Sequence, residues 1–214
     1  MKIVFFGDSI TDMSRERETD GTPRSLGSGF VRIIADSLMQ EAGKYEIINR
    51  GISGERSVDL YARIGRDVWQ YKPDVLNILV GINDIWHEKY NNGVDIERYK
   101  KTVSAMVEET KERLPQTRII LCEPFVLHGS ESDAFGFERL DKIRDYALAV
   151  KEAADRYGAA FVPLQEDLQK AVGRYDVKEI SYDGIHPNVV GAGIIARKWL
   201  KVFQNEKYVN ETRI

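Results

Sequence analysis

Five short apolar segments are spaced along the chain, and they constrain the fold more than any other feature of the sequence. They are rich in isoleucine, valine and phenylalanine and do not alternate apolar with polar residues. Strands that are buried on both faces of a parallel sheet have this pattern. The segments, each of which we predict to be a strand, are Lys2–Phe6, Tyr45–Asn49, Val75–Val80, Arg118–Cys122 and Ala160–Pro163.

The stretches between these segments predict amphipathic helices, because their apolar residues recur at spacings of three and four. Alternating strands and helices indicate an α/β fold with a parallel sheet and right-handed crossovers. We expect residues 1–214 to form a single domain, and we expect the polar tail 205–214 to lie on the surface or dock on a partner chain. The predicted helices lie within residues 30–38, 58–68, 99–114, 137–157 and 189–203.

The charges of the chain are nearly balanced, with 31 basic and 34 acidic residues and a net charge of −3. This balance gives no reason to expect a nucleic acid or an anionic membrane as a partner. The single cysteine, Cys122, excludes an internal disulfide and a metal site built on thiolates. We find no targeting segment and no apolar run long enough to cross a membrane, so we expect a cytoplasmic protein.

Four segments that follow predicted strands or precede the last helix carry chemically capable residues. Ligands of such sheets bind beyond the carboxyl ends of the strands. The sequences at these places are Gly7-Asp8-Ser9, Arg50-Gly51-Ile52-Ser53-Gly54, Gly81-Ile82-Asn83-Asp84 and Asp183-Gly184-Ile185-His186-Pro187. We therefore expect them to converge on one edge of the sheet.

Ser9 is a candidate nucleophile at this edge. A serine hydroxyl needs a base within hydrogen-bond reach, and the base needs a group to orient it. Of the three histidines, only His186 has a carboxylate, Asp183, three positions before it in a short loop, whereas His87 and His128 have no such partner in their own loops. Ser9 could instead cap a helix.

Donors for an oxyanion are also present. Asn83 can offer its side-chain amide, and Gly54 and Ser9 can offer backbone N–H groups. Asn83 could also simply stabilise a turn, and Gly54 could serve a tight turn alongside the oxyanion role. We expect Gly7 to permit a sharp turn that presents Ser9 at the sheet edge.

These residues lie in four motifs that resemble those of the GDSL, or SGNH, hydrolases. The motifs are "GDSIT", "NRGISGERS", "VGINDIW" and "YDGIHP", and they occur in family order over nearly the whole chain. The resemblance implies a triad of Ser9, His186 and Asp183. It also implies an oxyanion hole formed by Ser9, Gly54 and Asn83. The implied fold is a flavodoxin-like three-layer α/β/α sandwich with five parallel strands.

Within this family, "LGSGFV", "GINDIW" and "HPNVVG" are similar to segments of bacterial acetylxylan and acetyl-xylooligosaccharide esterases. This similarity implies an esterase that removes acetyl groups from carbohydrates, with no metal or organic cofactor and with a possible homo-oligomeric state. The candidates for substrate contact are Asp8, Ile82, Trp86 and Tyr182. Asp8 has a second interpretation, as an acceptor of hydrogen bonds that hold neighbouring loops. The polar segment 12–29 is expected to lie over the active site.

Two other functions remain open from the sequence. A lysophospholipase, thioesterase or general carboxylesterase would use the same residues, but it would need an apolar channel for a long acyl chain, and segment 12–29 has few large apolar residues. The third hypothesis is a flavodoxin-like binding or phosphotransfer module. It is disfavoured because "GDSIT" lacks a second acid two residues after Asp8 and no phosphate-binding glycine motif follows a strand.

Overall fold

Five strands form one parallel sheet in the computed structural model, which describes the backbone of residues 1–38 and 43–211 and the side chains of 1–38 and 43–205. The strand order is β2-β1-β3-β4-β5, which is the order of the flavodoxin-like fold. The predicted α/β/α sandwich is confirmed. The strands are β1 (Lys2–Gly7), β2 (Glu46–Gly51), β3 (Val75–Leu79), β4 (Arg118–Cys122) and β5 (Ala160–Val162).

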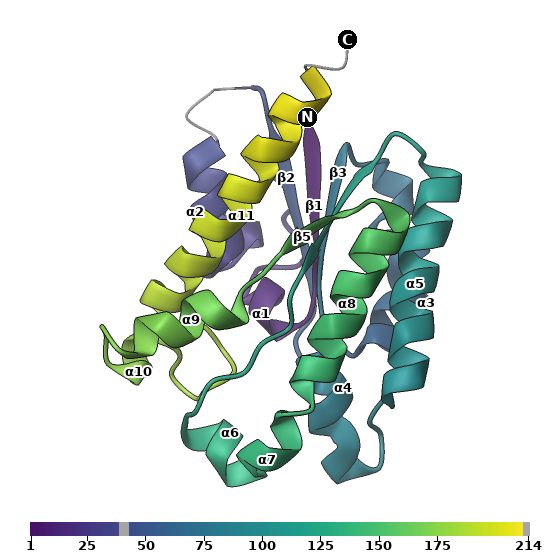
Figure 1. Cartoon of the computed structure of the whole chain (residues 1–214). Helices are drawn as coiled ribbons and strands as arrows, with labels where there is room; N and C mark the ends of the chain where they lie inside the picture. Colours follow the sequence, from purple (N-terminus) through teal and green to yellow (C-terminus); the bar gives the residue numbers. More distant parts are fainter. Residues whose placement is uncertain (39–42, 212–214) are drawn as a thin grey trace.

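Helices cover both faces of this sheet (Figure 1). One layer contains α3 (Ser57–Asp67), α5 (Ile96–Arg113) and α8 (Ile143–Tyr157), and the other contains α2 (Phe30–Leu38) and α11 (Val189–Glu211). The shorter helices follow strands or lie in connections. They are α1 (Ser9–Asp12), α4 (Ile82–Trp86), α6 (Ser130–Phe135), α7 (Phe137–Leu140), α9 (Gln165–Val172) and α10 (Val177–Ile180), with 3₁₀ turns at Pro23–Leu26, Trp69–Tyr71 and His87–Tyr90.

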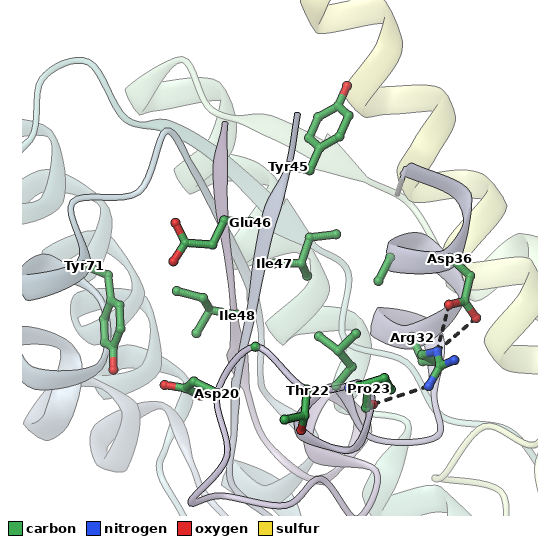
Figure 2. A pocket seen from close by; sticks show the side chains of 13 residues that line it. Asp20, Thr22, Pro23, Arg32, Asp36, Tyr45, Glu46, Ile47, Ile48 and Tyr71 are labelled. Atoms are coloured by element: carbon green, nitrogen blue, oxygen red, sulfur yellow. Dashed lines mark hydrogen bonds and ion pairs between the residues drawn. The ribbon is translucent and has the colours of Figure 1, made fainter. Parts of the chain in front are cut away.

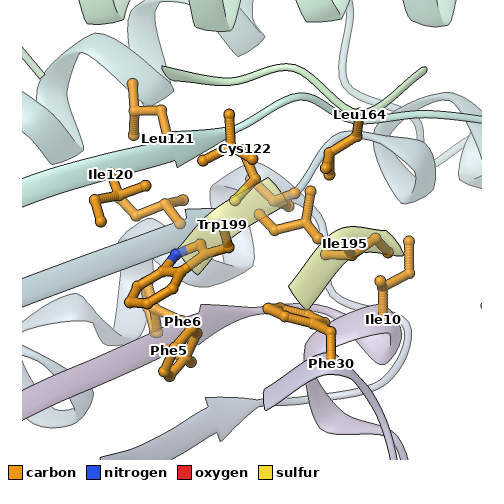
Figure 3. Packing of buried hydrophobic residues seen from close by; sticks show 14 of the residues in the cluster. Phe5, Phe6, Ile10, Phe30, Ile120, Leu121, Cys122, Leu164, Ile195 and Trp199 are labelled. Atoms are coloured by element: carbon orange, nitrogen blue, oxygen red, sulfur yellow. The ribbon is translucent and has the colours of Figure 1, made fainter. Parts of the chain in front are cut away.

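The strands lack an alternating pattern because both of their faces are covered. In β1, Ile3 to Phe6 are fully buried, and every residue of β3 is buried. Aromatic rings join the sheet to its helices, with the centroids of Phe5 and Trp199 5.1 Å apart and those of Phe5 and Phe30 5.9 Å apart (Figure 3). The Trp199 indole also donates to Asn77 of β3 at 2.8 Å. The central strands that carry the site are therefore rigidly held.

Two helix predictions differ from the structure. The expected helix over 137–157 is broken at Asp141 and Lys142, because α7 packs against α4 whereas α8 packs against α5. The last helix continues to Glu211, so most of the expected tail is helical; the side chains of 206–211 and residues 212–214 lie outside the described part. Among the helices described, none is both long and apolar enough to cross a membrane.

Candidate functional site

Ser9 lies where β1 ends and α1 begins, and its side chain is half-buried. Asp8, rather than Ser9, caps α1 by accepting a hydrogen bond from the Ile10 amide at 3.0 Å. Gly7 has no positive φ, so the turn from β1 into α1 does not depend on a left-handed glycine. Gly7 is instead needed for close packing: a Cβ there would lie 2.3 Å from Thr11 Oγ1 and 2.5 Å from the carbonyl oxygen of Leu79.

A chain of hydrogen bonds connects Ser9 to the loop before α11. Ser9 Oγ lies 2.8 Å from His186 Nε2, although the two residues are 177 positions apart. His186 Nδ1 lies 2.6 Å from Asp183 Oδ2. The other oxygen of Asp183 accepts from the backbone amides of Ile185 and His186 at 2.8 and 2.7 Å. The carboxylate is thereby fixed from both sides, and it holds the imidazole facing Ser9.

The electrostatics of this chain favour an ionised Asp183 and a more basic His186. Burial opposes ionisation of Asp183, but the hydrogen bonds from the His186 ring and from the two backbone amides lower its pKa below the ordinary value. Burial likewise disfavours the imidazolium, yet the hydrogen bond and charge of Asp183, with the charge of Asp8, raise the pKa of His186. The imidazole is therefore well suited to accept a proton from Ser9.

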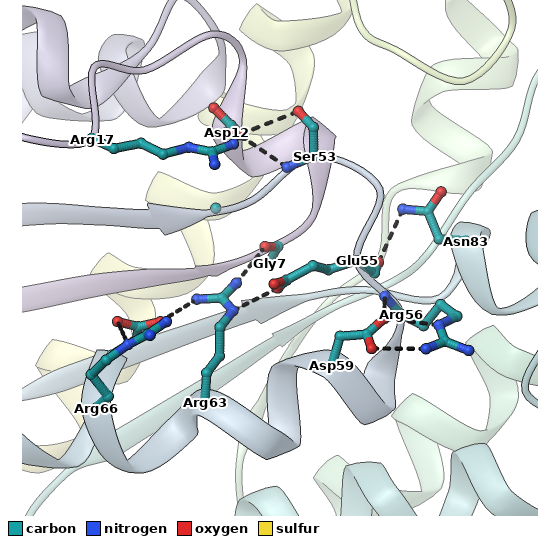
Figure 4. A network of polar contacts seen from close by, with 12 residues as sticks. Gly7, Asp12, Arg17, Ser53, Glu55, Arg56, Asp59, Arg63, Arg66 and Asn83 are labelled. Atoms are coloured by element: carbon teal, nitrogen blue, oxygen red, sulfur yellow. Dashed lines mark hydrogen bonds and ion pairs between the residues drawn. The ribbon is translucent and has the colours of Figure 1, made fainter.

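Asn83 and Gly54 are placed by loops that follow two other strands. Gly54 has a φ of +84°, and its Cβ position is open space. Within the described residues, the N–H groups of Ser9 and Gly54 have no backbone acceptor. The Asn83 amide donates to the carbonyl of Glu55 at 3.0 Å, which orients it and leaves its second hydrogen unused (Figure 4).

A polar network fixes the loop that contains Gly54. Asp12 accepts from the amide and the hydroxyl of Ser53 at 2.9 and 3.2 Å. Arg63 pairs with Glu55 at 2.6 Å and donates to the carbonyl of Gly7 at 3.2 Å, so it joins this loop to the end of β1 (Figure 4). Because Asp12 and Arg63 are buried, the loop is held in one geometry relative to Ser9.

Segment 12–29 begins at the end of β2, where Arg15 donates to the carbonyl of Gly51 at 2.8 Å. That the segment lies over Ser9 stays a prediction. Residues 20–23 and Leu26 lie beside the edge strand β2 and line a cavity of about 520 Å³ with residues 45–48, Tyr71 and part of α2 (Figure 2). Arg50 of β2 pairs with Asp20 and with the Tyr71 hydroxyl. Neither Ser9 nor His186 lines this cavity.

The four residues predicted to touch substrate separate into two pairs. Asp8 and Ile82 are 1 % and 2 % exposed, so they lie beneath the site rather than on its surface. Tyr182 is 53 % exposed, and its ring lies parallel to that of His186 with centroids 5.6 Å apart. Trp86 is half-buried and stacks on Phe135 of α6 at 4.5 Å. Of these four residues, Tyr182 and Trp86 are the two with side-chain surface that a ligand could reach.

Two features of the site were not predicted from the sequence. Residues 127–132 support the loop that contains Asp183 and His186: the amides of Glu131 and Ser132 donate to the Asp183 carbonyl, and a Cβ on Gly129 would lie 2.4 Å from the Gly184 nitrogen. His128 also has a carboxylate partner, Asp133, at 2.8 Å, so the expectation that it has none is wrong. That pair is exposed and does not contact Ser9.

Asp8 and Asp84 are buried carboxyl groups beneath the site. Burial raises the pKa of each from 3.8 to about 7, despite the hydrogen bonds that Asp8 accepts from Ile10 and Asp84 accepts from Ser57. Oδ1 of Asp8 makes the capping bond, whereas its Oδ2 is buried without a hydrogen-bond partner in the described structure. An asparagine would keep the acceptor and remove the buried charge.

Asp8→Asn should therefore make the free energy of unfolding less dependent on pH. An acid whose pKa is raised on folding stabilises the protein below its unfolded pKa, and this stabilisation is lost as the pH rises through the folded pKa. The difference in free energy of unfolding between the variant and the wild type should rise in favour of the variant by up to about 4 kcal/mol from pH 4 to pH 8. Urea unfolding of both proteins at several pH values in this window measures the effect. An exposed control, Asp155→Asn on α8, should show no such gain, and a pH-independent difference for Asp8→Asn would contradict the assignment.

Among the residues described, no group of three or more histidine, cysteine, aspartate or glutamate side chains is placed to hold a metal ion. The chemistry that this arrangement supports is proton transfer from a serine hydroxyl to an imidazole beside free N–H donors. Such a site can form and hydrolyse an acyl-serine.

Comparison with known proteins gives the same class of chemistry. Residues 5–194 match the GDSL-like lipase/acylhydrolase family. The chain is 34 % identical to an acetylxylan esterase of Geobacillus stearothermophilus over 94 % of its length and 92 % of the relative. It is 25 % identical to a GDSL esterase/lipase of Arabidopsis thaliana, over 96 % of its own length and 86 % of that protein.

Solved structures agree with this comparison. A GDSL-like lipase from Parabacteroides merdae superimposes with a TM-score of 0.87 at 34 % identity, with 94 % of each chain covered. The crystal structure of the Geobacillus acetylxylan esterase superimposes with a TM-score of 0.82 at 32 % identity, covering 94 % of this chain and 92 % of that one.

Proposed function

The chain belongs to the GDSL-like lipase/acylhydrolase family and is a carboxylic ester hydrolase, and we propose that it removes acetyl groups from oligosaccharides by means of Ser9, His186 and Asp183. The observation that carries this proposal is the continuous path from Ser9 Oγ to His186 Nε2 at 2.8 Å and from His186 Nδ1 to Asp183 at 2.6 Å. This path provides a nucleophile, a base and a group that orients the base.

In the first half of the proposed reaction, Ser9 Oγ attacks the acetyl carbonyl carbon while His186 takes the hydroxyl proton. The carbonyl oxygen becomes an oxyanion, which accepts hydrogen bonds from the N–H groups of Ser9 and Gly54 and from the Asn83 amide. Each such donor contributes about 2.7–4 kcal/mol to stabilisation of the transition state. The intermediate collapses when the C–O bond to the sugar breaks and His186 protonates the departing sugar oxygen.

In the second half, water hydrolyses the acetyl-enzyme. His186 removes a proton from the water as its oxygen attacks the acetyl carbon, and the same three donors hold the new oxyanion. When the bond to Ser9 Oγ breaks, His186 returns the proton to Ser9 and acetate leaves. Asp183 remains ionised throughout and stabilises the imidazolium in both halves.

The relatives support both the triad and the acetyl group. Three solved structures of the Geobacillus acetylxylan esterase are described as catalytic mutants, in which a serine, an aspartate or a histidine is replaced by alanine. The exposed ring of Tyr182 offers an aromatic face on which a sugar ring can pack, whereas the Trp86 ring is contacted by Phe135 and by the Lys89 ammonium. We assign the sugar moiety of the substrate to this side of the site.

The experiment compares acetate release from acetylated xylo-oligosaccharides with hydrolysis of p-nitrophenyl esters of increasing acyl length. We expect kcat/KM to be at least about tenfold higher for acetyl esters than for long-chain esters. A long acyl chain needs an extended apolar channel to be bound well, whereas a site built for a two-carbon acyl group does not provide one. A preference for the long chain would leave ester hydrolysis in place but overturn the acetyl assignment. A lysophospholipase or thioesterase would then be the better description.

A further inference from the structure

A groove on the side of the molecule carries a charge opposite to that of the whole chain. It has a volume of about 490 Å³ and lies between α9 and α11, which are neighbours in Figure 1. Neither Ser9 nor His186 lines it. Its cationic residues come from both helices and from the turn after α9. They are Lys170, Arg174, Arg197, Lys198 and Lys201.

Few carboxylates neutralise these cations. Asp167 is the acidic residue that lines the groove, and it is paired with Lys198 at 2.6 Å. Lys170 pairs with Glu166 of α9, but both side chains are largely exposed, so this pair contributes little. Arg174 and Arg197 make no ion pair and no side-chain hydrogen bond with the described residues. Two guanidinium groups are therefore free to bind an anion.

The groove itself has a net charge of +4, because five cations line it with one carboxylate. The whole chain has a net charge of −3, so the remaining residues together carry −7. Because the rest of the chain is acidic overall, its net charge does not favour a long polyanion or an anionic membrane. A short anionic ligand that fits within the groove would meet a local net charge of +4.

The shape and composition of the groove favour a ligand larger than a simple inorganic anion. Its volume lies in the range of small-molecule sites, about 300–1,000 Å³. The ring of Tyr175 is 49 % exposed and lines the groove, and Ile194 adds apolar surface. An aromatic face beside guanidinium groups suits a pyranose ring that bears a carboxylate, because the ring packs on the tyrosine while the arginine binds the carboxylate in a bidentate way.

We infer that the groove between α9 and α11 binds the carboxylate-bearing part of an acidic oligosaccharide, at a place separate from Ser9. The choice of a saccharide rests on the proposed function, whereas the anion site rests on the groove alone. The site would hold uronic-acid residues of a sugar chain. Acetylated acidic oligosaccharides would then be bound better than neutral ones of the same length.

The test measures binding rather than turnover. Isothermal titration with the Ser9→Ala variant compares a xylo-oligosaccharide that carries one uronic acid with the neutral oligosaccharide of equal length. We expect the acidic ligand to bind at least about tenfold more tightly at low salt, and we expect the difference to shrink as salt is added.

The double variant Arg174→Gln/Arg197→Gln should abolish this difference in affinity. Because both arginines are exposed and make no ion pair or side-chain hydrogen bond in the described structure, the double variant should fold normally.

A matched control removes the same amount of charge elsewhere. Arg98→Gln/Lys101→Gln changes two exposed cations of α5, in the opposite helix layer, and should leave the preference for the acidic ligand intact. Equal binding of both ligands, or loss of the preference in the control, would overturn the inference. So would inorganic phosphate or anionic phospholipid vesicles that bind through Arg174 and Arg197 as tightly as the acidic sugar.

Failure of this inference and failure of the proposed function can be told apart. If the wild type releases acetate from neutral oligosaccharides but shows no preference for the acidic ligand, the groove assignment fails alone. If the acidic ligand binds through the two arginines but no acetylated sugar is hydrolysed, the acetyl-sugar function fails and the anion site stands.

Discussion

Ser9→Ala should reduce kcat for hydrolysis of acetyl esters by a factor on the order of 10⁴ to 10⁶. The alanine removes the only group that the proposed mechanism uses to form the acyl-enzyme. The backbone N–H of residue 9, Gly54 and Asn83 would remain, so a small rate above that in water should persist. Acetate release under single-turnover and steady-state conditions measures the loss.

The fold should tolerate this substitution. The Ser9 hydroxyl contacts His186 and makes no other hydrogen bond within the described residues, and the side chain is only half-buried. The melting temperature should therefore change little, and Ser37→Ala on α2 should leave both rate and stability unchanged. If Ser9→Ala kept more than about one hundredth of the wild-type kcat, another nucleophile or a directly attacking water would have to be invoked.

The sheet was predictable because its strands carry a strong local signal. Residues 3–6 and 75–79 are buried on both faces, so all of them except Asn77 are apolar. Four of the five predicted strands differ from the structure by one or two residues at their ends. The helix over 137–157 was predicted as one element because its periodicity continues through Asp141 and Lys142. Only the packing of α7 on α4 and of α8 on α5 separates the two parts.

That Ser9, His186 and Asp183 lie together was predictable to the extent that chemistry and topology require it. Ser9, Asp183 and His186 follow from residue type and from the rule that the carboxyl ends of parallel strands share one edge. The contacts that support them depend on tertiary packing. No local pattern joins Gly129 to Gly184 or Asp84 to Ser57, which are 55 and 27 positions apart. The pair of His128 and Asp133 was missed because a short helix brings together residues five positions apart.

Asp183→Asn should lower kcat by about 10⁴-fold while leaving the site in place. The asparagine oxygen can still accept from the amides of Ile185 and His186, which now bond to Oδ1 at 2.8 and 2.7 Å. Its NH₂ group would then face His186 Nδ1 and donate to it. The ring proton would consequently sit on Nε2, where it faces Ser9 and prevents the imidazole from accepting the hydroxyl proton.

The same variant should shift the pH dependence of the residual activity. In the wild type His186 must be neutral to act as a base, and because its pKa is raised, activity should fall on the acid side at a pH above the ordinary value of 6.5. Without the Asp183 charge, burial is left as the main influence and lowers the pKa of His186. The acid limb of kcat/KM should therefore move to lower pH.

Asp133→Asn provides the matched control, since it removes the carboxylate from the other His–Asp pair, which is exposed and does not contact Ser9. Its rates and its pH profile should equal those of the wild type. A large loss of kcat in Asp183→Asn with an unmoved acid limb would mean that a group other than His186 titrates in that limb. An unchanged kcat would mean that Asp183 only holds the loop through its backbone hydrogen bonds. Only the loss and the shift together support Asp183 as the residue that sets both the tautomer and the basicity of His186.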